Sequence, residues 1–234
     1  MVPLPYDYAH LDAAASQLSH ILREAGIFHV FFGRYAAGLI GSNRVTNSAL
    51  AHVLKNLKGS NEQDINVITE RSARHTLNGI SAFTWSRDDG CWKYSYRDVE
   101  VSISTAAPDC GPWHFPSPRT AGKHTIDPRD LPDLDIMHPS TLILTKLKAW
   151  YESEVSQNPS MYMRSRAHLM DIMTTLQWLS DEKLRINLAA YPGVPKTELL
   201  NLLGKLYRNH QQARPYLAQT LSFIEMRDVM HSSR

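Results

Sequence analysis

Cysteine is scarce in this sequence, and no long hydrophobic run occurs in it. The 234 residues include only two cysteines, Cys91 and Cys110. Neither lies in a CxxC or Cys/His pattern, so a disulfide framework is excluded and structural zinc is not indicated. The longest apolar runs, such as residues 27–32, are far shorter than the roughly 18 residues of a membrane-spanning helix. The first residues also lack a basic region followed by an apolar one. We therefore expect a soluble, cytoplasmic protein.

An excess of charge of one sign is also missing. The chain has 25 Lys and Arg residues against 23 Asp and Glu residues, which gives a formal net charge of +2. This balance does not favour a nucleic-acid partner or a membrane surface. Hydrophobic residues make up 43% of the chain and charged residues 21%, which is typical of a folded domain and excludes wholesale disorder.

The first half of the chain has the pattern of alternating helices and strands. Apolar residues recur at helical spacing over residues 11–25, and a short apolar run that ends before Gly33 indicates a buried strand. Val99, Val101 and Ile103 fall on one face of another strand. Residues 87–90, Arg-Asp-Asp-Gly, are typical of a hairpin turn. We predict helices over 11–25 and 34–40, and strands over 27–32, 65–69, 81–85, 92–96 and 99–103.

The second half has the pattern of a helical domain. Residues 104–136 contain six prolines and are predicted to form a long irregular crossing. Helices are expected over 139–156, 161–180, 196–209 and 214–230. The predicted fold class is α+β, with a mixed sheet and flanking helices over residues 1–136, an insertion at 48–63, and a helical domain over residues 137–234.

The order of several segments resembles the nucleotidyltransferase-fold superfamily, and in particular its minimal nucleotidyltransferase-like proteins from fungi and bacteria. The segments are FFGRYAAGLIGSNRVTN, DINV, VEVSI, and MHPSTLILTKLKAW with RSRAHLMDI. The resemblance implies a strand that ends in Gly-Gly or Gly-Ser, whose backbone amides hold nucleotide phosphates at a helix start. It also implies an Asp-x-Asp strand and a third acidic residue, which bind two magnesium ions.

The family motif is only partly present here. Gly33 matches the first glycine, but Arg34 stands at the second small residue. Asp64 matches the first carboxylate, and Asn66 replaces the second. The segment 48–63 separates Asp64 from the preceding motif, either as a surface helix or as a remnant of a mis-spliced gene model.

The third carboxylate of the motif aligns with Ser102, and Glu100 lies on the same strand face one step earlier. A pair of divalent ions brings four positive charges, whereas Asp64 and Glu100 supply at most two negative ones and Arg34 adds a positive one. Such a cleft is poorly suited to paired metals. We therefore expect no cofactor; the alternative is Mg²⁺ with a nucleoside triphosphate, held by Asp64, Asn66 and Glu100.

Further basic residues are candidates for contact with a ligand. Arg44 either grips an anionic group or pairs with an acidic neighbour. Arg164, His168 and Asp171 form one helical stripe that either faces the cleft or is a solvated surface. Lys146 is favoured over Lys148 as a cleft residue. The predicted catalytic residues are Arg34, Asp64, Asn66 and Glu100, and the predicted ligand-binding residues are Gly33, Arg34, Arg44, Ser102, Lys146 and His168.

Three functions remain open from the sequence. The first is a small-molecule protein with a degenerate metal site, whose ligand is apolar and carries an acidic group. Its chemistry would be a metal-free cyclisation or isomerisation in a biosynthetic pathway. The aromatic residues near the hairpin, among them Trp85, Trp92 and Tyr94, would then either pack in the core or line the cleft. The alternatives are an active Mg²⁺-dependent nucleotidyltransferase that modifies a small molecule or protein, and a non-catalytic interaction module.

Overall fold

One mixed sheet organises the N-terminal half of the protein. The structure is a computed structural model that describes residues 9–42, 65–88, 90–97, 99–105, 118–126, 134–156, 158–191 and 194–232. Within these ranges, seven strands lie in the order β3-β4-β5-β2-β1-β7-β6. Their bounds are β1 His29–Phe32, β2 Ile65–Thr69, β3 Phe83–Ser86, β4 Cys91–Tyr96, β5 Val99–Thr105, β6 Lys123–Ile126 and β7 Leu134–Met137. The pairs β2–β5 and β1–β7 are parallel, and the other pairs are antiparallel.

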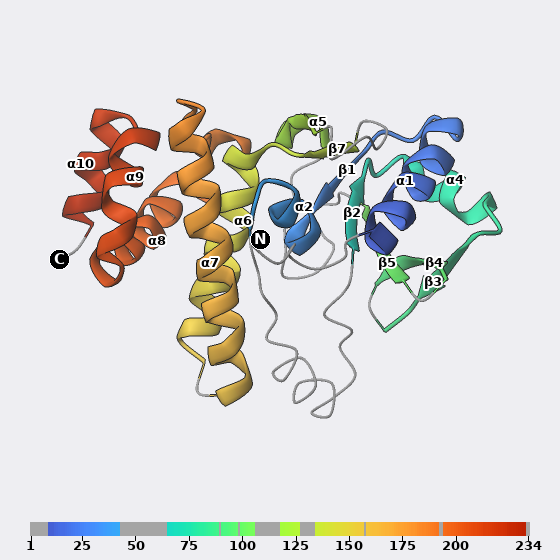
Figure 1. Ribbon diagram of the computed structural model, residues 1–234, viewed down its shortest axis with the longest axis horizontal. Helices are drawn as coiled ribbons and strands as arrows, with labels where there is room; N and C mark the ends of the chain where they lie inside the picture. The colour runs from blue at the N-terminus through green and yellow to red at the C-terminus, as the bar shows by residue number, and fades with distance from the viewer. Residues whose placement is uncertain are drawn as a thin grey trace, which may run out of the picture.

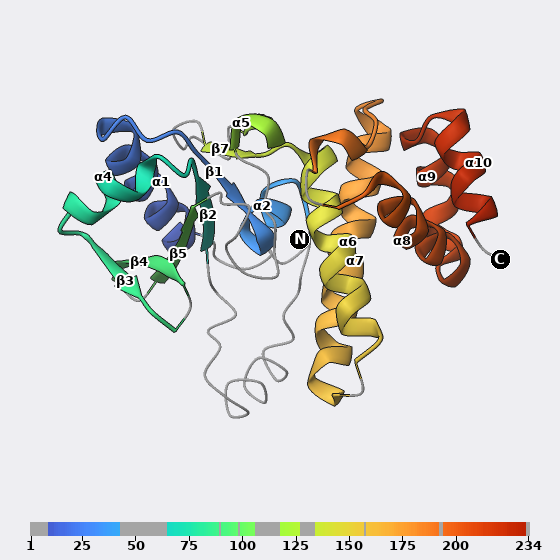
Figure 2. The ribbon, with the colours of Figure 1, turned by 180° about the vertical axis from the view of Figure 1, so that it is seen from behind.

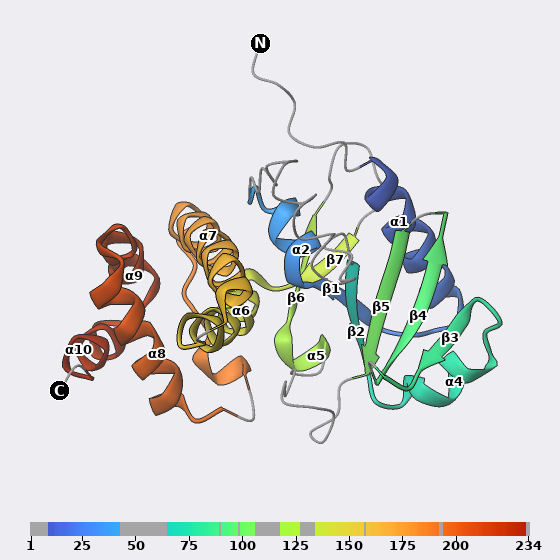
Figure 3. The same ribbon diagram turned by 90° about the horizontal axis from the view of Figure 1, so that it is seen from below.

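Helices flank the sheet and form the rest of the described chain. Figures 1 and 2 show the sheet at one end, the long helices α6 and α7 in the middle, and α8, α9 and α10 at the other end. Helix α1 contacts β5 and β7, and Figure 3 shows it beside β5. The bounds are α1 Ala9–Glu24, α2 Gly33–Leu39, α4 Ala73–Gly79, α5 Pro118–Ala121, α6 Pro139–Glu154, α7 Pro159–Asp181, α8 Lys196–Asn209, α9 Arg214–Thr220 and α10 Phe223–His231. The predicted α+β class is therefore confirmed.

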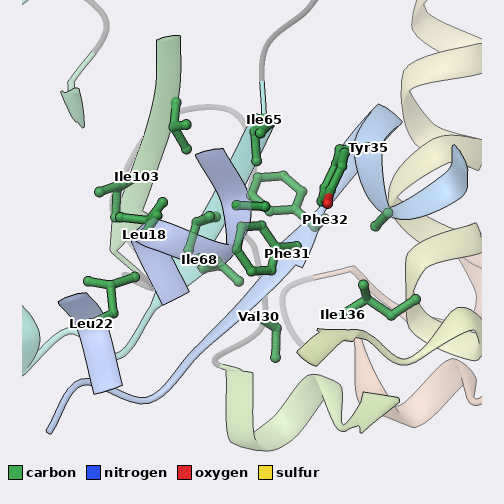
Figure 4. Packing of buried hydrophobic residues seen from close by; sticks show 14 of the residues in the cluster. Leu18, Leu22, Val30, Phe31, Phe32, Tyr35, Ile65, Ile68, Ile103 and Ile136 are labelled. Atoms are coloured by element: carbon green, nitrogen blue, oxygen red, sulfur yellow. The ribbon is translucent and has the colours of Figure 1, made fainter. Parts of the chain in front are cut away.

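The first hydrophobic core lies between α1 and the sheet. Leu18 and Leu22 of α1 are fully buried, as are Phe31 of β1 and Ile103 of β5. Figure 4 shows these side chains grouped together with residues of β2. The helical spacing in α1 and the alternation in β5 put one apolar face of each element toward the other, which is why they pack.

A second hydrophobic core holds the helical half together. It joins α6, α7, α8, α9 and α10 through fully buried residues such as Leu147, Leu176 and Leu203. Trp178 of α7 is partly buried and packs against both cores. The domain limits 1–136 and 137–234 stay a prediction.

Several predicted elements need correction. Residues 104–136 are not simply an irregular crossing, because they contain α5, β6 and β7, and β7 pairs with the central strand β1. Each of these elements has only four residues, too few to produce a periodic signal. The single helix predicted over 214–230 is two helices. Leu221 is extended, with ψ of 154°, and Ser222 caps α10 in a capping box with Glu225. Helix α4 was not predicted.

The predicted hairpin between β3 and β4 is confirmed, with Trp85 opposite Trp92. Val99, Val101 and Ile103 are all buried on one face of β5, as the alternation predicts. In the described part of the chain, no helix has the length and apolar character needed to cross a membrane.

Candidate ligand-binding site

The turn between β1 and α2 has a glycine that no other residue can replace without strain. Gly33 has a φ of +76°, in the left-handed region that favours glycine. A Cβ atom at this position would lie 3.1 Å from Nδ2 of Asn66. The turn therefore approaches the Asn66 amide of β2 closely, and two of the predicted site residues are neighbours in space.

A row of four side chains crosses the sheet at the level of this turn. Phe32 pairs with Asn66 across β1 and β2, Asn66 with Ser102 across β2 and β5, and Ser102 with Lys93 across β5 and β4. Paired residues in neighbouring strands project from the same face. The opposite face at β5 carries Val101 and Ile103, which are buried. Asn66, Ser102 and Lys93, which we call the donor row, therefore lie on the face opposite these two residues.

Lys93 determines the electrostatics of the row. Its ammonium group donates hydrogen bonds of 3.0 Å to Oγ of Ser102 and of 3.0 Å to Oε1 of Glu100. The Lys93 side chain is 19% exposed and that of Glu100 is 46% exposed. The positively charged Lys93 ammonium thus contacts Ser102, the residue that aligns with the third carboxylate of the nucleotidyltransferase motif.

The described residues of this row do not fit a pair of magnesium ions. Mg²⁺ takes oxygen ligands, mostly carboxylates and phosphates. Here the row offers an amide at Asn66, a hydroxyl at Ser102 and an ammonium at Lys93, while Glu100 pairs with that ammonium. No group of three or more His, Cys, Asp or Glu side chains placed to hold a metal occurs among the described residues. The predicted ligand Asp64 lies outside the described residues.

Lys146 lies apart from this row in a buried ion pair. Its Nζ is 2.6 Å from Oδ2 of Asp171, and the two side chains are 7% and 0% exposed. Oδ1 of Asp171 accepts a hydrogen bond of 3.0 Å from the hydroxyl of Ser42, just after α2. His168 is partly buried on α7, three residues before Asp171. That Lys146 and His168 contact a ligand stays a prediction.

The structure thus groups some predicted site residues and not others. The register of β1, β2 and β5 groups Gly33, Asn66, Ser102 and Glu100 in one region of the sheet. Arg34, which follows Gly33, is partly buried. Arg44 lies outside the described residues. Among the aromatic residues of the hairpin, Trp92 and Tyr94 belong to the first core, on the face opposite Lys93. Trp85, on the edge strand β3, is 36% exposed.

Sequence reasoning missed two residues near the turn. Lys93 lies between Trp92 and Tyr94 in the sequence, and this alternation indicates that its side chain faces away from the core. That Ser102 is its partner can be known only from the register of β4 and β5. Tyr35 in the first turn of α2 donates a hydrogen bond of 2.8 Å to Oδ1 of Asp12 in α1. Burial, together with the negative charge of Asp12, raises the pKa of the Tyr35 hydroxyl. Tyr35 therefore remains a neutral donor.

The fold is similar to that of a solved nucleotidyltransferase-like protein. A crystal structure of an antigenic nucleotidyltransferase-like protein from Paracoccidioides brasiliensis matches with a TM-score of 0.59 and 15% sequence identity, over 94% of this chain and 97% of that chain. No protein-family model matches the sequence, and a comparison with curated proteins finds no match. The chain therefore has a nucleotidyltransferase-like fold, as its motif order predicts, and this level of identity establishes the fold alone.

Proposed function

We propose that this protein binds the anionic group of a small molecule directly, through protein hydrogen-bond donors on the face of β2, β5 and β4 that carries the donor row. One observation carries the proposal: the Lys93 ammonium lies 3.0 Å from both Ser102 Oγ and Glu100 Oε1. In the related motif this place belongs to a metal ligand, which must be an acceptor. Here it holds a cation, and cations and donors bind anions.

The other members of the donor row support the same polarity. Ser102 accepts a hydrogen bond from Lys93, and no acceptor for its own hydroxyl hydrogen is found among the residues that the structure describes. A hydroxyl supplies one donor in addition to its acceptor sites, and an amide NH₂ group supplies two. The row therefore brings together an amide, a hydroxyl and an ammonium from three adjacent strands, a set that suits a carboxylate or phosphate. Arg34, next to Gly33, would add a guanidinium.

For the chemistry of the site we propose a metal-free cyclisation or isomerisation of an apolar substrate that carries the acidic group. Holding the acidic group at one end would orient the rest of a flexible substrate, and orientation alone lowers the barrier of an intramolecular reaction. Lys93 and Arg34 would stabilise negative charge, while Asn66 and Glu100 could hydrogen bond to the reacting part.

The test of the binding proposal is calorimetric titration with inorganic phosphate, decanoate and ATP, each with EDTA and with Mg²⁺. We expect phosphate and decanoate each to bind as tightly in EDTA as in Mg²⁺. Lys93→Met should weaken both by about tenfold to a hundredfold, because a hydrogen bond to a charged group contributes about 1.5–3 kcal/mol. The matched control is Lys183→Met, which removes an exposed positive charge from the helical half and should leave both affinities unchanged.

A second variant tests the role of Glu100. Its carboxylate already occupies one N–H of Lys93 and therefore competes with a ligand anion. Glu100→Gln should strengthen phosphate binding. If only ATP binds, if it requires Mg²⁺, and if Lys93→Met does not weaken it, the nucleotidyltransferase alternative replaces our proposal.

An interaction module is the second candidate function, and one observation favours it. Phe223 and Ile224, adjacent in α10, are 84% and 61% exposed. Large apolar side chains of this exposure are typical of contact surfaces when they cluster. Absence of binding to any of the three probes would favour this function.

A further inference from the structure

Helix α2, which follows the Gly33 turn, is held at both ends by buried polar contacts. At its start, Tyr35 donates a hydrogen bond to Asp12 of α1. Just beyond its end, the Ser42 hydroxyl donates to Asp171 of α7. These four residues are each no more than 7% exposed. The helix has seven residues, so a shift at either end is transmitted to the whole of it.

The Asp171 carboxylate that accepts the hydrogen bond from Ser42 also belongs to a buried ion pair. Asp171 is fully buried, and its Oδ2 is 2.6 Å from the Lys146 ammonium of α6. Removing two charges from water is unfavourable, and apolar residues of similar volume are often as stable or more so. A role other than stabilisation is therefore worth testing for the pair. What the pair supplies is a fixed carboxylate, with one oxygen on Lys146 and the other on Ser42.

The position of α2 matters because the turn that precedes it touches the donor row. A Cβ at Gly33 would come within 3.1 Å of Asn66 Nδ2, so the backbone of the turn and the Asn66 amide are in close contact. Asn66 in turn pairs with Ser102, the partner of Lys93. A shift of α2 by a few tenths of an ångström would change the spacing between the turn and the row.

We propose that the Lys146–Asp171 pair is a positioning element for the ligand site. It fixes the carboxylate that holds Ser42, and so fixes α2 and the Gly33 turn beside Asn66. The inference rests on the proposed function only for the identity of the site that is positioned. Lys146 would then influence ligand affinity through Asp171, Ser42 and α2, not by contact with the ligand.

The test compares Ser42→Ala with Thr175→Val. Ser42→Ala removes the hydroxyl that reaches Asp171 and leaves the ion pair in place. Thr175→Val is the matched control: the fully buried Thr175 donates a hydrogen bond of 2.7 Å to the backbone carbonyl of the same Asp171, away from α2. Hydrogen–deuterium exchange of the α2 amides should quicken in Ser42→Ala and not in Thr175→Val. Phosphate affinity should fall by about two- to thirtyfold in Ser42→Ala alone, the usual range for such coupling.

A second variant keeps the test decisive if loss of one charge unfolds the protein. The double change Lys146→Met with Asp171→Leu replaces the pair by apolar side chains of similar size, which folded proteins tolerate. We expect it to fold, to exchange the α2 amides faster and to bind phosphate more weakly. Wild-type exchange in both Ser42→Ala and the double variant would overturn the inference. If the wild-type protein binds none of the anions, the proposed function fails, while α2 exchange still tests the positioning role.

Discussion

Three side chains distinguish the donor row from the motif that the chain resembles. Asn66 and Ser102 align with two metal-binding carboxylates of that motif, but neither carries a negative charge, and Lys93 places a positive charge against Ser102. In our proposal, these side chains offer donors where the motif of the related superfamily has acceptors. Divalent cations bind acceptors and anions bind donors, so the proposed class of ligand depends on three side chains.

Another buried side chain makes a testable contribution to stability. His29 of β1 is 3% exposed, donates from Nδ1 to the Ile27 carbonyl at 3.0 Å, and accepts at Nε2 from the Ser19 hydroxyl at 3.0 Å. The carbonyl can only accept, so Nδ1 carries a hydrogen, and in the neutral ring Nε2 is then the acceptor. Burial lowers the pKa of His29 below its ordinary value of 6.5, although the bond to Ile27 opposes this.

The first prediction concerns pH. Below about pH 6.5 the unfolded chain takes up a proton at His29 before the folded protein does, so the free energy of unfolding falls as the pH is lowered. We expect urea denaturation to show this loss between about pH 7 and pH 5.5, a window above the titration of most carboxylates. His29→Gln should reduce the slope. An unchanged slope in this variant would assign the pH dependence to other groups, such as His138 or His210, whose pKa values burial also lowers.

Among the secondary-structure elements, the β1–α2 connection is the one that most directly shapes the site. Local signals predicted it well: a short apolar run, a glycine, and then helix-forming residues. The hairpin of β3 and β4 was predicted for the same reason, since turn residues separate two runs rich in aromatic residues. Short elements such as β6 and β7 were missed, because four residues form a strand only where a neighbouring strand is available to pair with them.

The second prediction compares two glycines in this region. Gly26 and Gly33 both have positive φ angles, +67° and +76°, but a Cβ at Gly26 would meet nothing within 4 Å. Gly26→Ala should lower the free energy of unfolding by about 1–2 kcal/mol, the usual penalty of this backbone region. Gly33→Ala should lower it further, because its Cβ crowds Asn66.

Chemical denaturation of the two variants measures this difference. The double variant Gly33→Ala with Asn66→Ala should recover the additional loss, since the crowded amide is then absent. Equal losses in Gly26→Ala and Gly33→Ala would mean that the turn is not in close contact with β2.

The described part of the protein contains two hydrophobic cores that meet at α2, α6 and α7. Trp178 of α7 packs against both cores, and α2 contacts both α6 and α7. This arrangement places the positioning pair Lys146–Asp171 in the helical half and the donor row in the sheet half. Ligand binding at the sheet is therefore expected to depend on how firmly the helical half holds α2.

The third prediction concerns this junction. Wild-type protein should unfold in one calorimetric transition, whereas Trp178→Ala should separate the transition into two, because it removes a contact shared by both cores. Leu179→Ala is the matched control, since Leu179 is fully buried in the second core only. It should destabilise the helical half by about 2–5 kcal/mol without the same loss of coupling. A single transition in Trp178→Ala would show that other contacts, such as those of α2 and of Leu142 of α6 in the first core, couple the two halves.

Local information in the chain accounts for much of this architecture. The spacing of apolar residues predicted α1, α2, β2, β4, β5 and the long helices, and the order of motifs predicted the nucleotidyltransferase-like fold. It also indicated that Asn66 and Ser102 occupy places where carboxylates are expected. These are properties of neighbouring residues, which steric preference and hydrophobic periodicity encode directly.

The polarity of the site depended instead on contacts between separate elements. Lys93 meets Ser102, nine positions later, because β4 and β5 pair in one register, and Ser42 meets Asp171 across 129 positions of the chain. The spacing of apolar residues predicts neither contact, since each depends on how the elements pair and pack. The net charge of the candidate site is therefore a property of the folded sheet, and no single segment of the sequence carries it.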